Sequence, residues 1–345
     1  MADGARDVTE LDDAYVARLL PTRDPRAHKG SNGKLLAICG SLDYLGAALL
    51  VARAAGRAGA GLVSLCVPAS LQPLAAGRVP EVTTHGLAET EVEGEVDVEL
   101  AMEWILDFDH DALVIGPGLR PGLATADLVE AVLDGGAEFE EGQGSDAGVR
   151  RAAEGLPPAV LDAEALNSLA TIEGWPERLR RPAVLTPHPG EFRRLSAGEE
   201  PADEAEGPDL GTDDEARLTA AMEAAERWRA VVVLKGAKTV IAGADGRVCR
   251  APFENPALGT GGTGDVLAGV IGALLAQRVD PFDAACLGVY LHGVAGEAVR
   301  ERIGDSGLLA SDLPDEVARA RRRLALVRER LTGERRLGFR VSTDA

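Results

Sequence analysis

Short apolar runs alternate with longer Ala-rich or amphipathic stretches along most of the chain. The runs are nearly continuous, each is closed by glycine, proline or a polar residue, and they lie at 35–39, 62–67, 112–115, 159–161, 183–185 and 230–234. Strands buried on both faces of a sheet have this pattern. Helices are predicted at 46–58, 266–277 and 283–303, and a hairpin at 239–242 and 247–250. The alternation predicts an α/β fold, with a central, mainly parallel sheet flanked by helices on both faces.

The length of 345 residues fits one large α/β domain. We expect this single domain to span residues 28–330, between a short N-terminal extension (1–27) and a C-terminal tail (331–345). Three segments with many acids, or with glycine and glutamate, interrupt the pattern and are expected to be surface insertions at 89–99, 135–156 and 196–216. We assign no function to these insertions.

The charge of the chain narrows the classes of partner. Acidic residues exceed basic ones by 56 to 36, which leaves a formal net charge of −20, and only four basic residues are lysines: Lys29, Lys34, Lys235 and Lys238. A GC-rich genome would explain arginine in place of lysine, but not the excess of acids. A lysine-poor acidic surface is typical of proteins that work in concentrated salt, where screening removes self-repulsion. The same charge argues against binding to nucleic acid or to an anionic membrane.

The sequence predicts neither a membrane span nor an export signal. Every apolar stretch is shorter than the ~20 residues needed to cross a bilayer, and residues 1–13 are acidic with no hydrophobic run. The four cysteines are scattered without a Cys-x-x-Cys pair, so they are interpreted as small buried residues rather than metal ligands or disulfides. We therefore expect a cytoplasmic protein.

The strongest chemical motif is Asn-Pro-Ala-Leu-Gly-Thr-Gly-Gly-Thr-Gly-Asp at 255–265, which leads directly into an apolar helix. Glycines let backbone N–H groups approach phosphate oxygens, and the start of a helix favours negative charge. At that position Asp265 can take a proton from an attacking hydroxyl while the amides stabilise a transferring phosphoryl group. The alternative is a glycine-rich turn in which Asp265 only caps the helix. The match of these glycines to the dinucleotide-binding fingerprint is weak, because no clear strand leads into them.

Three further motifs follow predicted strands. Lys235-Gly236-Ala237-Lys238-Thr239 holds two of the four lysines at a strand end, where lysine serves as a point charge for phosphate. Two prolines bracket His188 in Thr-Pro-His-Pro-Gly-Glu (186–191) and hold its backbone rigid. Asp162 ends another strand, and Asn167 follows about one helical turn later, so their oxygens are candidate ligands for Mg²⁺ or phosphate. The respective alternatives are a solvated edge lysine, a polar turn and a helix cap.

In this order the motifs resemble the nicotinamide-nucleotide-hydrate dehydratase family. The resemblance rests on His-Lys-Gly (28–30), Cys-Gly-Ser (39–41), Gly-Pro-Gly-Leu (116–119) and, above all, His-Pro-Gly-Glu (188–191) with the glycine-rich block, and it extends over residues 28–313. It implies the ribokinase fold and dehydration of the S epimer of hydrated NADH or NADPH at the expense of ADP or ATP. Many members also carry an N-terminal epimerase domain, which we do not expect because only 27 residues precede His28.

The resemblance also implies the binding residues. Those expected to contact the hydrated dinucleotide are Ala47, Gly118, His188 and Asp265, with Asp265 as the catalytic base; those expected to contact the nucleotide are Lys235, Gly236, Ala237, Lys238, Thr239 and Gly264. The implied cofactor is Mg²⁺, and the implied assembly is a homo-oligomer such as a tetramer. Arg120 departs from the pattern, since members often have glycine there. The competing hypothesis is a small-molecule kinase of the same fold that acts on a vitamin precursor or a sugar, and a third is a nucleotide-binding module without turnover.

Overall fold

A ten-stranded sheet forms the centre of the computed structural model, which describes residues 8–135, 156–197 and 209–333. The strands are β1 (Thr9–Glu10), β2 (Lys34–Ile38), β3 (Leu62–Pro68), β4 (Thr83–Leu87), β5 (Ala112–Ile115), β6 (Ala159–Leu161), β7 (Ala183–Leu185), β8 (Val231–Leu234), β9 (Val240–Ala242) and β10 (Val248–Arg250). Their order in the sheet is β1-β10-β9-β8-β7-β6-β5-β2-β3-β4. Neighbours are parallel except on either side of β9, which forms antiparallel pairs with β8 and β10.

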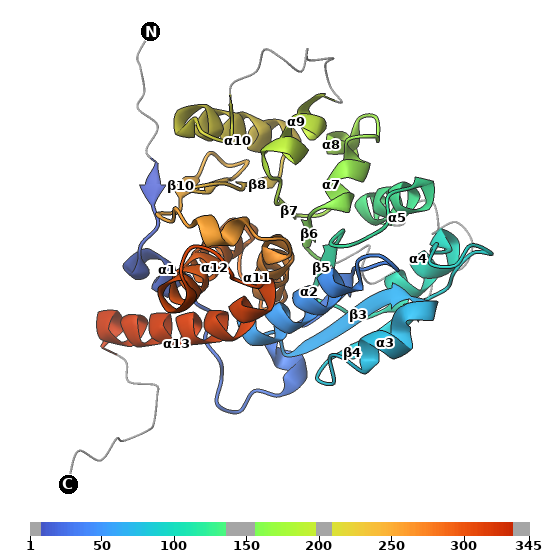
Figure 1. The fold of residues 1–345 in the computed structure, drawn as a ribbon, viewed down its shortest axis with the longest axis horizontal. Coiled ribbons are helices and arrows are strands. Elements are labelled where there is room, and N and C mark those ends of the chain that lie inside the picture. The colour runs from blue at the N-terminus through green and yellow to red at the C-terminus, as the bar shows by residue number, and fades with distance from the viewer. Residues whose placement is uncertain (1–7, 136–155, 198–208, 334–345) are drawn as a thin grey trace.

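Helices cover both faces of the sheet (Figure 1). One face carries α1 (Asp13–Leu19), α2 (Leu45–Ala58), α3 (Gln72–Ala76), α11 (Thr263–Ala276), α12 (Pro281–Ile303) and α13 (Leu313–Thr332). The other carries α4 (Val98–Asp107), α5 (Leu123–Asp134), α7 (Glu164–Leu169), α8 (Trp175–Arg178), α9 (Pro189–Ala197) and α10 (Asp214–Trp228). The fold class predicted from the sequence is confirmed, because each face of the sheet has its own buried apolar cluster.

The predicted strands were placed well where apolar runs are buried. β5, β6 and β7 have the predicted bounds, and the hairpin forms as β9 and β10 with a turn at Gly246 (φ 86°). The four cysteines are buried free thiols, as expected. The helix predicted to start at residue 266 begins three residues earlier, at Thr263, so Asp265 lies inside its first turn and the cap position is Gly262.

Two strands of the sheet, β4 and β1, were not predicted from the sequence. β4 is the edge strand of the sheet, and its residues are largely polar and partly exposed, so it contains no apolar run. β1 lies in the segment 1–27 that we expected to be an extension, and it pairs in parallel with β10 at the opposite edge of the sheet. The helix that follows it, α1, packs against α13 and α12.

The acidic segments differ in how much of them the structure describes. At 89–99, Glu89 accepts hydrogen bonds from the amides of Ser70 (2.8 Å) and Gly94 (2.9 Å), and Asp97 caps α4, so this segment is an ordered loop. Most of the predicted insertions at 135–156 and 196–216, and of the tail at 331–345, lies outside the described residues.

Candidate active site

Polar residues from three neighbouring strands meet at the carboxyl edge of the sheet. Asp162 follows β6, Thr186 follows β7 and Lys235 follows β8. Asp162 is buried, and its Oδ1 accepts hydrogen bonds from Thr186 Oγ1 (2.7 Å) and Lys235 Nζ (2.8 Å). Ligands bind at this edge in open α/β sheets, so the position of these charges indicates a functional site.

The start of α11 faces the same charges. Gly262 precedes the helix with a left-handed backbone (φ 91°), and Gly264 and Asp265 lie in its first turn. A Cβ atom at Gly264 would lie 3.5 Å from Lys235 Nζ and 3.9 Å from Asp162 Oδ2, so a side chain there would enter the space beside these two groups. The first N–H groups of a helix lack intrahelical acceptors and favour anions. This glycine therefore keeps open a space suited to a phosphoryl group.

Tight packing fixes the position of α11. A Cβ atom at Gly269, one turn further along, would lie 2.4 Å from the carbonyl oxygen of Val51 in α2, so only glycine allows the two helices to approach this closely. At the helix start, the buried His292 of α12 donates from Nε2 to the carbonyl oxygen of Thr263 (2.9 Å). Burial lowers the pKa of His292 to about 4, so the ring is neutral and its role here is to hold α12 against the first turn of α11.

Asp265 has the electrostatics of a general base. Burial raises the pKa of its carboxyl from the usual 3.8 to about 7, and the negative charge of Asp162 adds to this, while Lys235 opposes it. A base works best when its pKa lies near the working pH. An Asp that only capped a helix would not need this environment, and the cap position belongs to Gly262. The geometry therefore favours a catalytic role for Asp265.

Lys235 is held between two carboxylates. Its Nζ lies 2.8 Å from Asp162 Oδ1 and 3.7 Å from Glu191 Oε2. Burial lowers the pKa of the lysine, but the two carboxylates outweigh this and leave the pKa raised. Glu191 is itself buried, and burial raises the pKa of its carboxyl. The ammonium is therefore kept charged at the strand end, where it can meet a phosphate.

The His188 ring is oriented by its own loop. Its Nδ1 accepts from the amides of Gly190 (3.0 Å) and Glu191 (3.3 Å), which places the proton of the neutral ring on Nε2. Burial, followed by the charges of Lys235 and Arg194, lowers the pKa of the imidazole. The His188 amide also donates to Glu191 Oε2 (2.8 Å), and Nε2 of the neutral ring lies 3.5 Å from Glu191 Oε1.

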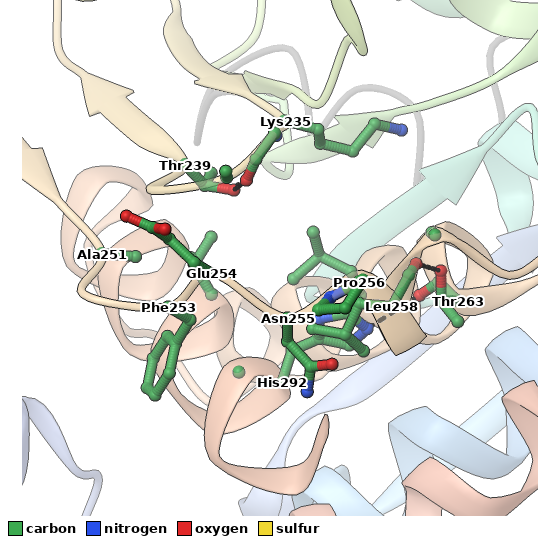
Figure 2. Close-up of a pocket in the computed structure, with 17 residues that line it drawn as sticks. Lys235, Thr239, Ala251, Phe253, Glu254, Asn255, Pro256, Leu258, Thr263 and His292 are labelled. Carbon is green, nitrogen blue, oxygen red and sulfur yellow. Dashed lines mark hydrogen bonds between the residues drawn. The ribbon is translucent and has the colours of Figure 1, made fainter. Parts of the chain in front are cut away.

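A cavity of about 520 Å³ opens beside Lys235 and the start of α11 (Figure 2). Lys235 and Thr239 lie on one side of it, and Pro256, Leu258 and His292 on the other. Its lining also includes Gly236, Ala237 and Gly264. Small-molecule sites are concave and mostly apolar with a few polar groups, which describes this cavity. Five of the six residues expected to bind the nucleotide line it; Lys238 does not.

Lys238, in the loop after β8, forms ion pairs instead of lining the cavity. Lys238 has a left-handed backbone (φ 52°) and pairs with Glu254 (2.7 Å) and Asp214 (3.4 Å). Behind the loop, the fully buried Arg217 of α10 donates to the carbonyl oxygens of Leu210 (2.8 Å), Gly211 (2.8 Å) and Ala237. Arg217 was not predicted as a site residue, because nothing in the sequence marks a helical arginine as buried.

The two remaining residues expected to bind substrate touch one another at the other side of the site. A Cβ atom at Gly118 would lie 2.7 Å from Ala47 Cβ and 2.6 Å from the carbonyl oxygen of Tyr44, and φ at Gly118 is +69°. Gly116, two residues earlier, also has a positive φ and would clash with the carbonyl oxygen of Asp162. The Gly-Pro-Gly loop after β5 therefore lies directly between α2 and Asp162.

Asp162 and Asn167, the two predicted metal ligands, bond to different partners in the structure. The side chain of Asn167 donates to Glu164 (3.0 Å) and accepts from Arg194 (3.0 Å), whereas Asp162 bonds to Thr186 and Lys235. Within the described residues, no group of three or more His, Cys, Asp or Glu side chains could hold a metal ion. The carboxylates described at the site are Asp162, Glu191 and Asp265, and the charge of Asp162 contributes to the raised pKa of Asp265.

The four lysines lie at different ends of the strands. Lys34 is the first residue of β2 and pairs with Asp109, and Lys29 lies in the short helical turn before it. Both are thus at the amino end of β2, opposite the site, whereas Lys235 follows the carboxyl end of β8 and lines the cavity. No described helix is long and apolar enough to cross a membrane.

Comparison with known proteins decides the family. The family model described as NAD(P)H-hydrate dehydratase matches residues 35–319, which include every residue of the site. The chain belongs to this family. It is 35% identical over 88% of its length to an ADP-dependent (S)-NAD(P)H-hydrate dehydratase from Xanthomonas campestris, of which it covers 93%. It is also 40% identical over 88% of its length to a bifunctional NAD(P)H-hydrate repair enzyme from Moorella thermoacetica.

Solved structures agree with the family. The crystal structure of an ADP/ATP-dependent NAD(P)H-hydrate dehydratase from Bacillus subtilis, co-crystallised with ATP and Mg²⁺, superposes with a TM-score of 0.71 and 31% identity, over 93% of this chain and 100% of that one. A more distant ribokinase-like protein shares the fold, which confirms the predicted fold family. The chain spans about half the length of the bifunctional repair enzymes that it matches.

Proposed function

We propose that this protein dehydrates the S epimer of hydrated NADH or NADPH and couples this to the cleavage of ADP into AMP and phosphate. The observation that carries the proposal is Asp265, a carboxyl with a pKa near 7 at the start of α11, beside Lys235 and next to the nucleotide cavity. The activity named for the relative from X. campestris, which this chain covers almost completely, supports the same assignment.

The chemistry starts at the hydroxyl group of the hydrated nicotinamide ring. Asp265 accepts the hydroxyl proton while that oxygen attacks the terminal phosphorus of ADP and the bond to AMP breaks. The Lys235 ammonium and the amides of the α11 start stabilise the charge on the phosphoryl group. The lone pair of the ring nitrogen then expels phosphate, and loss of a proton from the neighbouring ring carbon restores the reduced nicotinamide. One ADP and one hydrate thus give one AMP, one phosphate and one NADH.

The residues around Asp265 would position the two substrates. The loop from Lys235 to Thr239 and Gly264 would hold the nucleotide, because most of them line the large cavity. Ala47, Gly118 and His188 would hold the hydrated dinucleotide. A fixed orientation of the ring against Asp265 explains why only one epimer would react.

The site fits a Mg²⁺ ion that arrives with the nucleotide. Mg²⁺ is usually held by one or two carboxylates together with substrate phosphates and water, rather than by a cage of protein ligands. Asp162 Oδ1 accepts hydrogen bonds from Lys235 and Thr186, and Asp162 Oδ2 faces the space kept open by Gly264. Asp265, whose pKa is raised in part by the charge of Asp162, is the second carboxylate that would hold the ion. When bound there, Mg²⁺ would neutralise phosphate charge. The ATP and Mg²⁺ of the B. subtilis crystals support this assignment; Asn167 as a ligand has no such support.

The test is an assay on hydrated NADH with ADP and Mg²⁺. The absorbance of reduced nicotinamide should rise, with AMP and inorganic phosphate released in equal amounts. Asp265→Asn should bind nucleotide nearly as well but turn over ~10²–10⁴-fold more slowly, the usual effect of removing a general base. Accumulation of a phosphorylated dinucleotide without reduced cofactor would refute the dehydratase. Phosphorylation of a vitamin precursor or sugar instead would establish the kinase hypothesis.

The working environment is a second part of the proposal. A net charge of −20 with four lysines against 32 arginines fits a cytosol rich in salt, where ions screen the repulsion between acids. We therefore expect a cytoplasmic, salt-adapted enzyme. The homo-oligomer expected from the resemblance stays a prediction, which light scattering in molar KCl would check.

A further inference from the structure

The sheet changes direction between β2 and β5, and this creates a crevice. From β2 the chain continues through α2 to β3 on one side, and from β5 it continues through α5 to β6 on the other side. α2 and α5 consequently lie on opposite faces of the sheet, and their N-termini flank the carboxyl ends of β2 and β5. Ligands in doubly wound sheets bind at this switch point. Ala47 and Gly118 lie on its α2 side, which leaves the α5 side without an assigned role.

A separate cavity of about 260 Å³ occupies the α5 side. Its lining comes from the loop after β2, the ordered acidic loop near residue 95, the Arg120–Gly122 turn and the first turn of α5. A whole dinucleotide needs more room than this, since drug-sized ligands occupy ~300–1,000 Å³. The cavity is of the size expected for one part of such a ligand. It shares the loop at 116–122 with the Gly118 contact to Ala47.

Three features of this cavity favour an anion. α5 has 12 residues, and Leu123 and Ala124 of its first turn line the cavity. The first N–H groups of a helix have no intrahelical acceptor and favour an anion. Arg120 lines it too, and it forms no ion pair within the described part of the chain. Ser41, which is 2% exposed, also lines the cavity, and its buried Oγ has no hydrogen-bond partner among the residues described. A buried hydroxyl without a partner is costly, so it points to a ligand.

We propose that this cavity binds a phosphate of the hydrated dinucleotide, in the half of the molecule that does not react. The proposal rests on the proposed function and extends its substrate site across the switch point. Arg120 supplies the charge, the α5 amides supply directed donors, and the Ser41 hydroxyl supplies a further donor. Glu95, the one carboxylate in the lining, is an acceptor suited to ribose hydroxyls next to that phosphate.

The decisive experiment compares hydrated NADH with hydrated reduced nicotinamide mononucleotide, which lacks the AMP half and therefore its phosphate. Arg120→Ala should raise KM for hydrated NADH roughly tenfold, with little change in kcat, in KM for ADP or in KM for the truncated substrate. Leu123→Pro removes one free amide at the first helical position, where proline is tolerated, and should raise the same KM severalfold. Arg53→Ala, which removes an exposed arginine of α2, is the matched control and should change nothing.

A binding measurement tests the proposal even if a variant does not fold or the protein shows no dehydratase activity. With a non-hydrolysable ATP analogue saturating the nucleotide cavity, ADP-ribose should still bind to the unaltered protein, and Arg120→Ala should weaken that binding roughly tenfold. Ser41→Ala should raise the Tm of the ligand-free protein and reduce the further rise caused by ADP-ribose. Equal effects on both substrates, or no ADP-ribose binding beside the analogue, would overturn the inference. An unaltered protein that does not dehydrate hydrated NADH would instead refute the proposed function, and the ADP-ribose result would still decide the subsite.

Discussion

The pH dependence of catalysis follows directly from the environment of Asp265. In the proposed mechanism Asp265 acts as a carboxylate. Because burial and Asp162 raise its pKa to about 7, about half of the protein carries an ionised Asp265 at pH 7. One unit lower, only about a tenth does. We therefore expect kcat/KM for hydrated NADH to rise about fivefold from pH 6 to pH 7, to change by about tenfold per pH unit below pH 6, and to level off above about pH 8.

Asp162→Asn tests the cause of this pKa. The substitution removes the negative charge that disfavours ionisation of Asp265, and it frees the Lys235 ammonium, which favours ionisation. Both effects lower the pKa of Asp265, so the midpoint of the pH profile should move to lower pH even if the maximal rate falls. A profile of kcat/KM against pH for both proteins, in one buffer series at constant KCl, measures this. A midpoint that stays at the same pH, or moves upward, would refute the electrostatic argument.

The same pKa makes a prediction about stability. Between about pH 4 and pH 7 the folded protein holds a proton on Asp265 that the unfolded chain has released, so the contribution of this group to stability falls as the pH rises. The difference of about three pH units corresponds to about 4 kcal/mol. Asp265→Asn should thus unfold at a higher temperature than the unaltered protein at pH 8, and at nearly the same temperature at pH 4.5. Equal Tm differences at both pH values would contradict this.

Three further outcomes are expected. Dialysis into low salt should abolish activity, with recovery in molar KCl; full activity in dilute buffer would end the salt-adaptation hypothesis. Gly264→Ala, whose Cβ would lie 3.5 Å from Lys235 Nζ, should raise KM for ADP tenfold or more while the Tm changes little, as calorimetry and steady-state kinetics would show. His188→Ala should weaken binding of the hydrated dinucleotide more than that of ADP, and equal losses measured by titration would place the ring with the nucleotide instead.

The sequence predicted those parts of the fold that depend on burial. β5, β6 and β7 are short apolar runs buried on both faces, so their bounds could be read from the pattern. β4 and β1 could not, because each is an edge strand defined by its partner. The partner of β1 is β10, about 240 residues further along, and no local signal reports such a pairing.

The residues of the site, too, could be predicted only where the sequence carries a local signal. Asp162, Lys235 and Asp265 were found because each follows a strand or starts a helix, and the fold brings such positions together. Glu191 was part of a quoted motif but received no role; its signal was its position three residues after His188, the spacing at which a glutamate bonds back to the amide before a helix. Arg217 gave no signal at all, since its buried guanidinium is explained only by the backbone carbonyl groups around it.

The pairing of β1 with β10 and the packing of α1 against α13 have a consequence for synthesis on the ribosome. β1 needs β10, and α1 needs α13, so residues 9–19 cannot dock until the chain has been made beyond residue 313. The edge of β10 must meanwhile stay unpaired, and an unpaired edge strand is a template for aggregation. A nascent chain of this protein therefore completes its sheet with its earliest residues last. Shortening the N-terminus to residue 20 would leave that edge open in every finished molecule.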